Sequence, residues 1–230
     1  MNYIGIDIGS TCAKTVVLNE KKELILEFVQ PTGWSSVDTA EEIRQKLEFA
    51  GINLSNESSH CVATGYGRIS VPYADKTVTE ITCHALGAVH LFQHPDLTVI
   101  DIGGQDTKII QIEQGFVKDF IMNDKCAAGT GRFLEVMANT LSLRPNEMFD
   151  LARLGSDTTI SSMCTVFAES EVIGLIGKGE PKENIAYAVV NSTIRKVAAQ
   201  VSRMNGEMFT FCLTGGLCEC DYIREALSKE

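Results

Sequence analysis

The fold of this chain is decided by residues 98–108, TVIDIGGQDTK, because they repeat residues 4–14, IGIDIGSTCAK. Both stretches contain Asp-Ile-Gly, and in each a lysine follows the aspartate by seven residues. A second apolar segment comes after each copy, which is typical of two strands joined by a glycine turn. Two copies with the same internal register indicate a duplicated structural unit.

The apolar patterning predicts an α/β protein with more strand in its first half and more helix in its second. Beyond the two repeats, strands are expected at residues 24–29, 60–64, 116–121 and 208–213. Helices are expected at residues 39–49, 81–92, 130–141, 146–154, 166–176, 181–204 and 221–228. We expect two lobes that share a cleft, an N-terminal lobe of residues 1–96 and a C-terminal lobe of residues 97–230.

Composition narrows the classes of protein to which this chain can belong. The 230 residues carry a formal net charge of −10 and no long lysine or arginine run, which argues against nucleic acid or an anionic membrane as a partner. The N-terminus enters a strand pattern without a basic segment, so no secretory signal is expected, and no apolar run approaches a membrane span. Eight cysteines in such a chain are typical of thiols or metal ligands rather than disulfides. We therefore expect a reduced, soluble, cytoplasmic protein.

The two glycine turns carry the residue types that bind nucleotide phosphates. Glycine lets the backbone approach a ligand closely, and the N–H groups of the turn can surround phosphate oxygens. One such turn is more often an ordinary hairpin, but the matched pair together with a late Thr-Gly-Gly at residues 214–216 favours a nucleotide clamp. The candidate nucleotide-binding residues are Ser10, Thr11, Cys12, Ala13, Lys14, Gly103, Gly104, Gly215 and Gly216.

Three further residues of the turns are candidates for catalysis. Asp7 and Asp101 can each hold Mg²⁺, directly or through its water ligands. Gln105 stands where a carboxylate would serve as a base, and an amide can orient a water molecule but cannot take its proton. We therefore expect slow hydrolysis of ATP until a partner protein docks.

Two cysteines, Cys126 and Cys164, each come shortly before an apolar helical pattern. A helix N-terminus favours the thiolate, which is the form that binds a metal or a cluster. A cubane iron–sulfur cluster needs four thiolates, and a two-fold dimer with two from each chain would supply them. The alternative is that a free cysteine is a small buried hydrophobe, and Cys12, Cys61, Cys83 and Cys212 are interpreted as packing or bystander thiols. Cys218 and Cys220 are interpreted as solvent-facing thiols, with extra metal ligands as the alternative.

The two turns and the late Thr-Gly-Gly resemble the actin–hexokinase ATPase superfamily, whose fold is a duplicated, ribonuclease H-like α/β unit. Four segments narrow the resemblance further: residues 63–68, 74–76, 123–135 and 164–171. Together they are similar to the activators of 2-hydroxyacyl-CoA dehydratases, which also resemble ATPase subunits of benzoyl-CoA reductase in the BadF/BadG/BcrA/BcrD ATPase family. The resemblance covers residues 3–218.

This resemblance implies an oxygen-sensitive homodimer with one 4Fe–4S cluster between the subunits, held by Cys126 and Cys164 of each protomer. It implies ATP or ADP with Mg²⁺ at residues 10–14, 103–105 and 215–216. A ferredoxin or flavodoxin would reduce the cluster, and ATP hydrolysis would drive a low-potential electron to a dehydratase. The family continues past the position of Glu230 with a strand and a helix that help to cover the adenine. The adenine side is therefore expected to be open, to be completed by another element, or to be missing because the chain is truncated.

Other functions stay open at the level of sequence. The partner can be a dehydratase, a benzoyl-CoA-type reductase or another double-cluster protein, and nothing in the sequence names the acyl-CoA substrate. A small-molecule kinase of the same fold would need a carboxylate base and would not need the two cysteines. A cytoskeletal or chaperone-like ATP switch would need polymer contacts or a peptide-binding domain.

Overall fold

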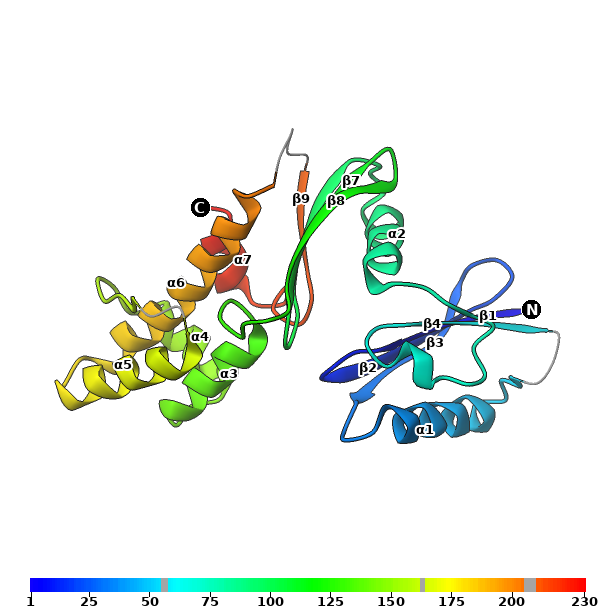
Figure 1. Ribbon diagram of the computed structural model, residues 1–230, viewed down its shortest axis with the longest axis horizontal. Helices are drawn as coiled ribbons and strands as arrows, with labels where there is room; N and C mark the ends of the chain where they lie inside the picture. The colour runs from blue at the N-terminus through cyan, green and yellow to red at the C-terminus, as the bar shows by residue number, and fades with distance from the viewer. Residues whose placement is uncertain (55–57, 162–163, 205–209) are drawn as a thin grey trace. The chain divides into compact units, whose positions relative to one another are not determined.

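A computed structural model describes residues 1–54, 58–161, 164–204 and 210–230 of the chain. The chain forms two compact units, Met1–Gly87 and Ala88–Glu230 (Figure 1). Helix α2 (Glu80–Phe92) contains the division between them. The division into lobes of residues 1–96 and 97–230 stays a prediction. No helix in the described part of the chain has both the length and the apolar character needed to cross a bilayer.

The first unit is built on a five-stranded sheet with the strand order β3-β2-β1-β4-β5. Its strands are β1 (Asn2–Ile8), β2 (Cys12–Leu18), β3 (Leu24–Pro31), β4 (Ser59–Thr64) and β5 (Lys76–Thr77), and its helices are α1 (Ser36–Phe49) and the short η1 (Arg68–Ser70). Strands β1, β2 and β3 are antiparallel neighbours, whereas β4 runs parallel to β1. Alternate residues of β1, among them Ile4, Ile6 and Ile8, are buried with Ile43 and Leu47 of α1. This period of two is what a sheet with one covered face requires.

The second unit repeats that arrangement in a four-stranded sheet with the order β8-β7-β6-β9. Its strands are β6 (Leu97–Ile102), β7 (Thr107–Glu113), β8 (Phe116–Asn123) and β9 (Thr210–Thr214). Its helices are α3 (Gly131–Thr140), α4 (Pro145–Ala152), α5 (Thr165–Gly177), α6 (Lys182–Val201) and α7 (Asp221–Leu227). Strand β6 is buried along its whole length. The predicted start of β9 at residue 208 lies outside the described residues.

Pairing registers confirm the duplication predicted from the sequence. Asp7 pairs with Lys14 across β1 and β2, and Asp101 pairs with Lys108 across β6 and β7. The fourth strand of each unit, β4 or β9, runs parallel to the strand that carries the aspartate. The order of the first four strands is therefore the same in both sheets.

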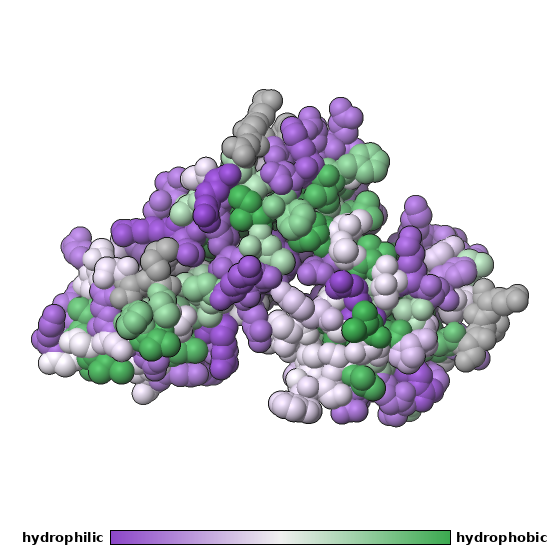
Figure 2. All heavy atoms as spheres, viewed as in Figure 1, coloured by the Kyte–Doolittle hydropathy of each residue, from purple (hydrophilic) through white to green (hydrophobic). Residues whose placement is uncertain are grey.

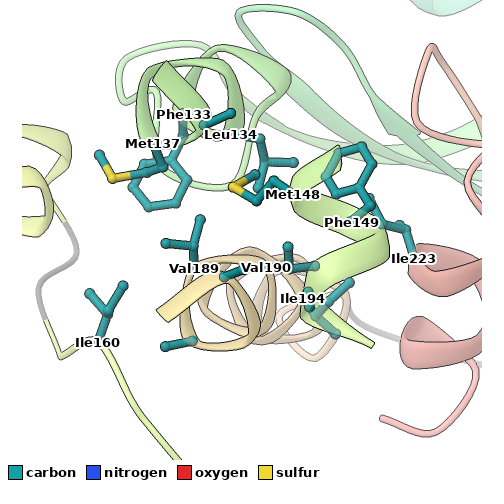
Figure 3. Packing of buried hydrophobic residues seen from close by; sticks show 14 of the residues in the cluster. Phe133, Leu134, Met137, Met148, Phe149, Ile160, Val189, Val190, Ile194 and Ile223 are labelled. Carbon is teal, nitrogen blue, oxygen red and sulfur yellow. The ribbon is translucent and has the colours of Figure 1, made fainter. Parts of the chain in front are cut away.

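Helices α3, α4, α6 and α7 of the second unit share one hydrophobic core, shown in Figure 3. Phe133, Leu134 and Met137 come from a single face of α3 and are at most 1% exposed. They pack with Met148 and Phe149 of α4 and with residues of α6 and α7. Burial of this size fixes α3 firmly, and α3 begins directly after the loop that carries Cys126.

Candidate nucleotide turns and cysteine loop

The turn of the first unit connects β1 to β2 and is closed by a hydrogen bond from Gly9 N–H to the Cys12 carbonyl oxygen, at 3.1 Å. Lys14 Nζ lies 3.1 Å from Asp7 Oδ2, and the two side chains are 50% and 34% exposed. Ser10 and Thr11 are exposed, while Ala13 is buried, so Ala13 can offer a ligand only its backbone. This turn presents hydroxyl groups, backbone N–H groups and one solvated lysine.

The turn of the second unit has the same backbone closure, from Gly103 N–H to the Asp106 carbonyl oxygen at 2.9 Å. Its charges are buried, because the side chains of Asp101, Asp106 and Lys108 are only 8–9% exposed. Lys108 Nζ lies 2.7 Å from Asp106 Oδ1 and 3.5 Å from Asp101 Oδ2. Gln105 at the tip of the turn is exposed. Lys108 is thus a buried counter-ion, whereas Lys14 faces solvent.

Each turn is backed by a Thr-Gly pair at the end of the neighbouring parallel strand. Gly65 follows β4 with a φ of +84°, and Gly215 follows β9 with a φ of +86°. A Cβ added at Gly65 would come within 2.5 Å of the Ile8 carbonyl oxygen, and one at Gly215 within 2.5 Å of the Ile102 carbonyl oxygen. Both positions therefore require glycine, for conformation and for space. The equivalence of Gly65 and Gly215 is a functional feature that the sequence reasoning missed.

A cavity of about 630 Å³ opens beside the turn of the second unit. Its walls are the turn, α3, α4 and the segment from β9 to α7, and include Gly103, Gly104, Phe149, Arg153, Gly216 and Cys220. Arg153 lies 5.5 Å from the centre of the Tyr222 ring, a contact that joins α4 to α7. The structure thus brings three of the predicted glycines together beside a volume that suits a small molecule. Cys220 was predicted to face solvent and is instead half-buried in this wall.

Cys126 lies in residues 124–130, between β8 and α3, and is half-buried. Thr130 is the N-cap of α3, so Cys126 belongs to the loop rather than to the helix end itself. Asn123 Nδ2 donates to the Cys126 carbonyl oxygen at 2.9 Å and to the Ala128 carbonyl oxygen at 3.1 Å. These bonds give the cysteine a defined backbone position.

Cys164 is the N-cap of α5 and is exposed, as predicted for a cysteine at a helix mouth. The helix that follows exposes apolar side chains, including Val166, Phe167 and Ile173 at 66%, 67% and 57%. Figure 2 shows hydrophobic surface over this end of the second unit. Helix α5 packs against α3, so both cysteines belong to one helical region of one unit. By contrast, Cys61 and Cys212 are buried in strands, as expected for packing thiols.

The donor atoms of these sites fit the cofactors implied by the resemblance. Cys126 and Cys164 are two thiols with access to the surface, which is half of what a cubane cluster requires. Within the described residues no group of three or more histidines, cysteines or carboxylates is placed to hold a metal alone. Asp7 and Asp101 offer the oxygen ligands that Mg²⁺ prefers.

The sequence profile of the BadF/BadG/BcrA/BcrD ATPase family matches residues 4–230. This chain belongs to that family. The (R)-2-hydroxyglutaryl-CoA dehydratase activating ATPase of Acidaminococcus fermentans is 42% identical over 231 residues, which are 98% of this chain and 86% of the relative. The resemblance stated from the motifs is confirmed.

Solved structures of the family have the same fold. Component A of the Acidaminococcus fermentans (R)-2-hydroxyglutaryl-CoA dehydratase superposes with a TM-score of 0.89 at 40% identity, over 100% of this chain and 88% of that one. The activator of the 2-hydroxyisocaproyl-CoA dehydratase from Clostridium difficile, with bound ADPNP, gives 0.86 at 35% identity, over 100% and 85%. A glucokinase from Streptomyces griseus gives 0.55 at 14% identity, over 100% and 88%, and shares the fold alone. The predicted actin–hexokinase-like fold is therefore confirmed.

Proposed function

We propose that this protein is an ATP-dependent activator that passes a low-potential electron from a 4Fe–4S cluster between two copies of the chain to a 2-hydroxyacyl-CoA dehydratase. The observation that carries the proposal is that one unit contains both a nucleotide turn with its cavity and two accessible cysteines near helix starts. A kinase of this fold has no need of such cysteines. The dehydratase activators among the relatives support the same class of partner.

The nucleotide would be held by the backbone of the two turns and by Gly215 and Gly216. Lys14 is the cation we assign to the phosphates, because it is exposed and has a single carboxylate beside it. Asp7 and Asp101 are assigned to Mg²⁺, and Gln105 to the orientation of the attacking water. An amide in that place cannot accept the proton, so hydrolysis would be slow until a partner completes the site.

Cys126 and Cys164 are the proposed cluster ligands, and the cluster would supply one-electron chemistry when bound. Cys164 occupies the N-cap position of α5, beside the first N–H groups of that helix, which have no partner within it. Asn123 holds the carbonyl groups of Cys126 and Ala128 and so limits where the Cys126 sulfur can lie. A cluster with two thiol ligands from each protomer would respond to relative movement of the subunits. ATP binding would act on the cluster through that movement.

The proposed partners are a ferredoxin or flavodoxin as reductant and a 2-hydroxyacyl-CoA dehydratase, or a related benzoyl-CoA-type reductase, as electron acceptor. The proposed coupling separates this function from that of a plain ATPase. It predicts that ATP turnover by the isolated protein rises when the dehydratase is added.

The first test is iron and acid-labile sulfide in anaerobically purified protein, measured for the unchanged chain and for Cys126→Ser and Cys164→Ser. We expect about four irons per dimer in the unchanged protein and a loss of most iron in both variants. Cys218→Ser is the matched control and should keep its iron. A stable, nucleotide-binding dimer without iron after anaerobic reconstitution would overturn the electron-donor function.

A further inference from the structure

The nucleotide turn of the second unit is hydrogen-bonded directly to the start of the helix that follows the cysteine loop. Gly131 N–H donates to the Gly103 carbonyl oxygen at 2.9 Å, and Arg132 N–H donates to the Gly104 carbonyl oxygen at 2.7 Å. These are first-turn N–H groups of α3, which have no partner within the helix. The turn therefore caps α3, in place of a side chain.

A third bond ties the turn to the cysteine loop itself. Thr107, the first residue of β7, donates its hydroxyl to the Gly129 carbonyl oxygen at 2.6 Å and is fully buried. Thr107 pairs across the sheet with Asn123, which holds the Cys126 and Ala128 carbonyl oxygens. Two cross-strand neighbours, Thr107 and Asn123, thus hold three carbonyl groups of the loop that carries Cys126.

The contact between turn and loop has little room to slip. A Cβ on Gly131 would lie 3.2 Å from the Gly103 carbonyl oxygen, closer than an ordinary van der Waals contact, so the two hydrogen-bonded backbones leave little room for a side chain. A Cβ on Gly129 would meet the Lys196 side chain of α6 at 2.7 Å. Movement of the turn must therefore be transmitted to the loop and to the start of α3, because packed interiors yield little.

We propose that Thr107 is a positioning residue that couples nucleotide occupancy of the turn at residues 103–105 to the position of Cys126. The inference rests on the proposed function and names the path by which ATP would reach the cluster ligand. The peptide unit between Gly103 and Gly104 accepts a hydrogen bond from α3 at its carbonyl oxygen, and its N–H would donate to a bound phosphate. A phosphate bound to the N–H polarises that peptide and strengthens the bond on its other side. Thr107 then transmits the change in the turn to the cysteine loop through its hydrogen bond to the Gly129 carbonyl oxygen.

The test uses the whole chain, free of iron, in which each cysteine is alkylated by N-ethylmaleimide and the rates are resolved by peptide mass spectrometry. Cys220 lines the cavity, so slower alkylation of Cys220 reports that Mg²⁺·ADP is bound. Cys126 reports the coupling. We expect ADP to slow Cys126 about fivefold in the unchanged protein, the factor that one net hydrogen bond supplies.

Thr107→Val keeps the branched shape and removes the hydroxyl, so it should keep the protection of Cys220 and lose that of Cys126. Thr107→Ser restores the hydroxyl and should restore the protection of Cys126. Equal protection of Cys126 in the unchanged protein and in Thr107→Val would overturn the coupling. Failure of ADP to protect Cys220 in unchanged protein would instead overturn the proposed nucleotide site, and the coupling with it. Circular dichroism of both variants confirms that each is folded.

Discussion

The two glycine turns have the same backbone and different surroundings. In the first unit the ion pair between Asp7 and Lys14 is open to solvent, while in the second the pair between Asp101 and Lys108 is buried and gains Asp106 as another carboxylate. The position of Asp106 is taken by Cys12 in the first copy. A duplicated element has thus kept its shape and divided its roles. The lysine of one turn is exposed, and the lysine of the other is buried between two carboxylates.

The segments that follow the third strand of each unit, β3 or β8, also differ in length and in how they contact the turn. In the first unit, residues 32–35 lead from β3 to α1, and Thr32 binds the turn through its hydroxyl, which donates to the Gly9 carbonyl oxygen at 2.7 Å. In the second unit, residues 124–130 lead from β8 to α3, and the first two residues of α3, Gly131 and Arg132, donate their N–H groups to the turn. The equivalent connection is longer there and contains Cys126. The comparison shows where a cysteine loop was accommodated without disturbing the turn.

The largest expected difference between the turns is in the effect of removing each lysine. Lys108→Met would leave Asp101 and Asp106 buried without their cation, and should lower the free energy of unfolding by about 3–5 kcal/mol. Lys14→Met breaks an exposed pair and should cost about 1 kcal/mol or less. Urea unfolding of both variants measures the difference in stability. Calorimetric titration with ADP should show that, relative to its loss of unfolding free energy, Lys14→Met loses more ADP affinity than Lys108→Met does. Equal stability losses would mean that the two turns have not diverged.

Alanine at the two backing glycines should affect both turns alike. Gly65→Ala and Gly215→Ala force a side chain into a left-handed conformation against a carbonyl oxygen, which should cost about 1–3 kcal/mol each and weaken ADP binding. Gly87→Ala is the control, since an added Cβ meets nothing within 4 Å in helix α2, and it should be neutral or slightly stabilising. Unfolding and ADP titration of all three variants measure this. If alanine at only one of the two sites left stability and ADP binding unchanged, Gly65 and Gly215 would not be equivalent.

The last comparison concerns a buried thiol in the fourth strand of each unit. Burial raises the pKa of Cys61 to about 12, helped by Asp75, and burial raises the pKa of Cys212 to about 11. Unfolded thiols lose their protons near pH 9, so the stability these groups contribute is complete below pH 9 and is lost as the pH rises toward 11 and 12. The free energy of unfolding should therefore fall between pH 8 and pH 10.5.

Cys61→Ala and Cys212→Ala should each flatten that decline, and Cys218→Ala, which changes a half-buried thiol, should leave it unchanged. Urea midpoints at four pH values measure the slopes. An identical slope in all three variants would show that other groups control the alkaline transition.

Most of the elements were predicted from the sequence, because a long apolar periodicity indicates a helix or strand whatever its tertiary neighbours are. Helix α6 was predicted at residues 181–204 and observed at Lys182–Val201. The two-residue β5 was missed, because a strand so short has no periodicity. The candidate site was predicted as far as the turns, the late glycines and the two cysteines. Asp106 and Thr107 were missed, although both stand inside the repeat, because their roles depend on partners from other parts of the sequence.

The sequence by itself determined the duplication, the glycine turns and the family. These depend on the order of residue types along short stretches, which the chain states directly. Only the tertiary structure decided which lysine is buried, which glycines back the turns and what holds the cysteine loop. Thr214 contacts Asp101 from 113 residues away, through the parallel pairing of β9 with β6. Burial and hydrogen bonding are properties of what the fold brings together, so they follow from the packing of distant elements rather than from any one stretch.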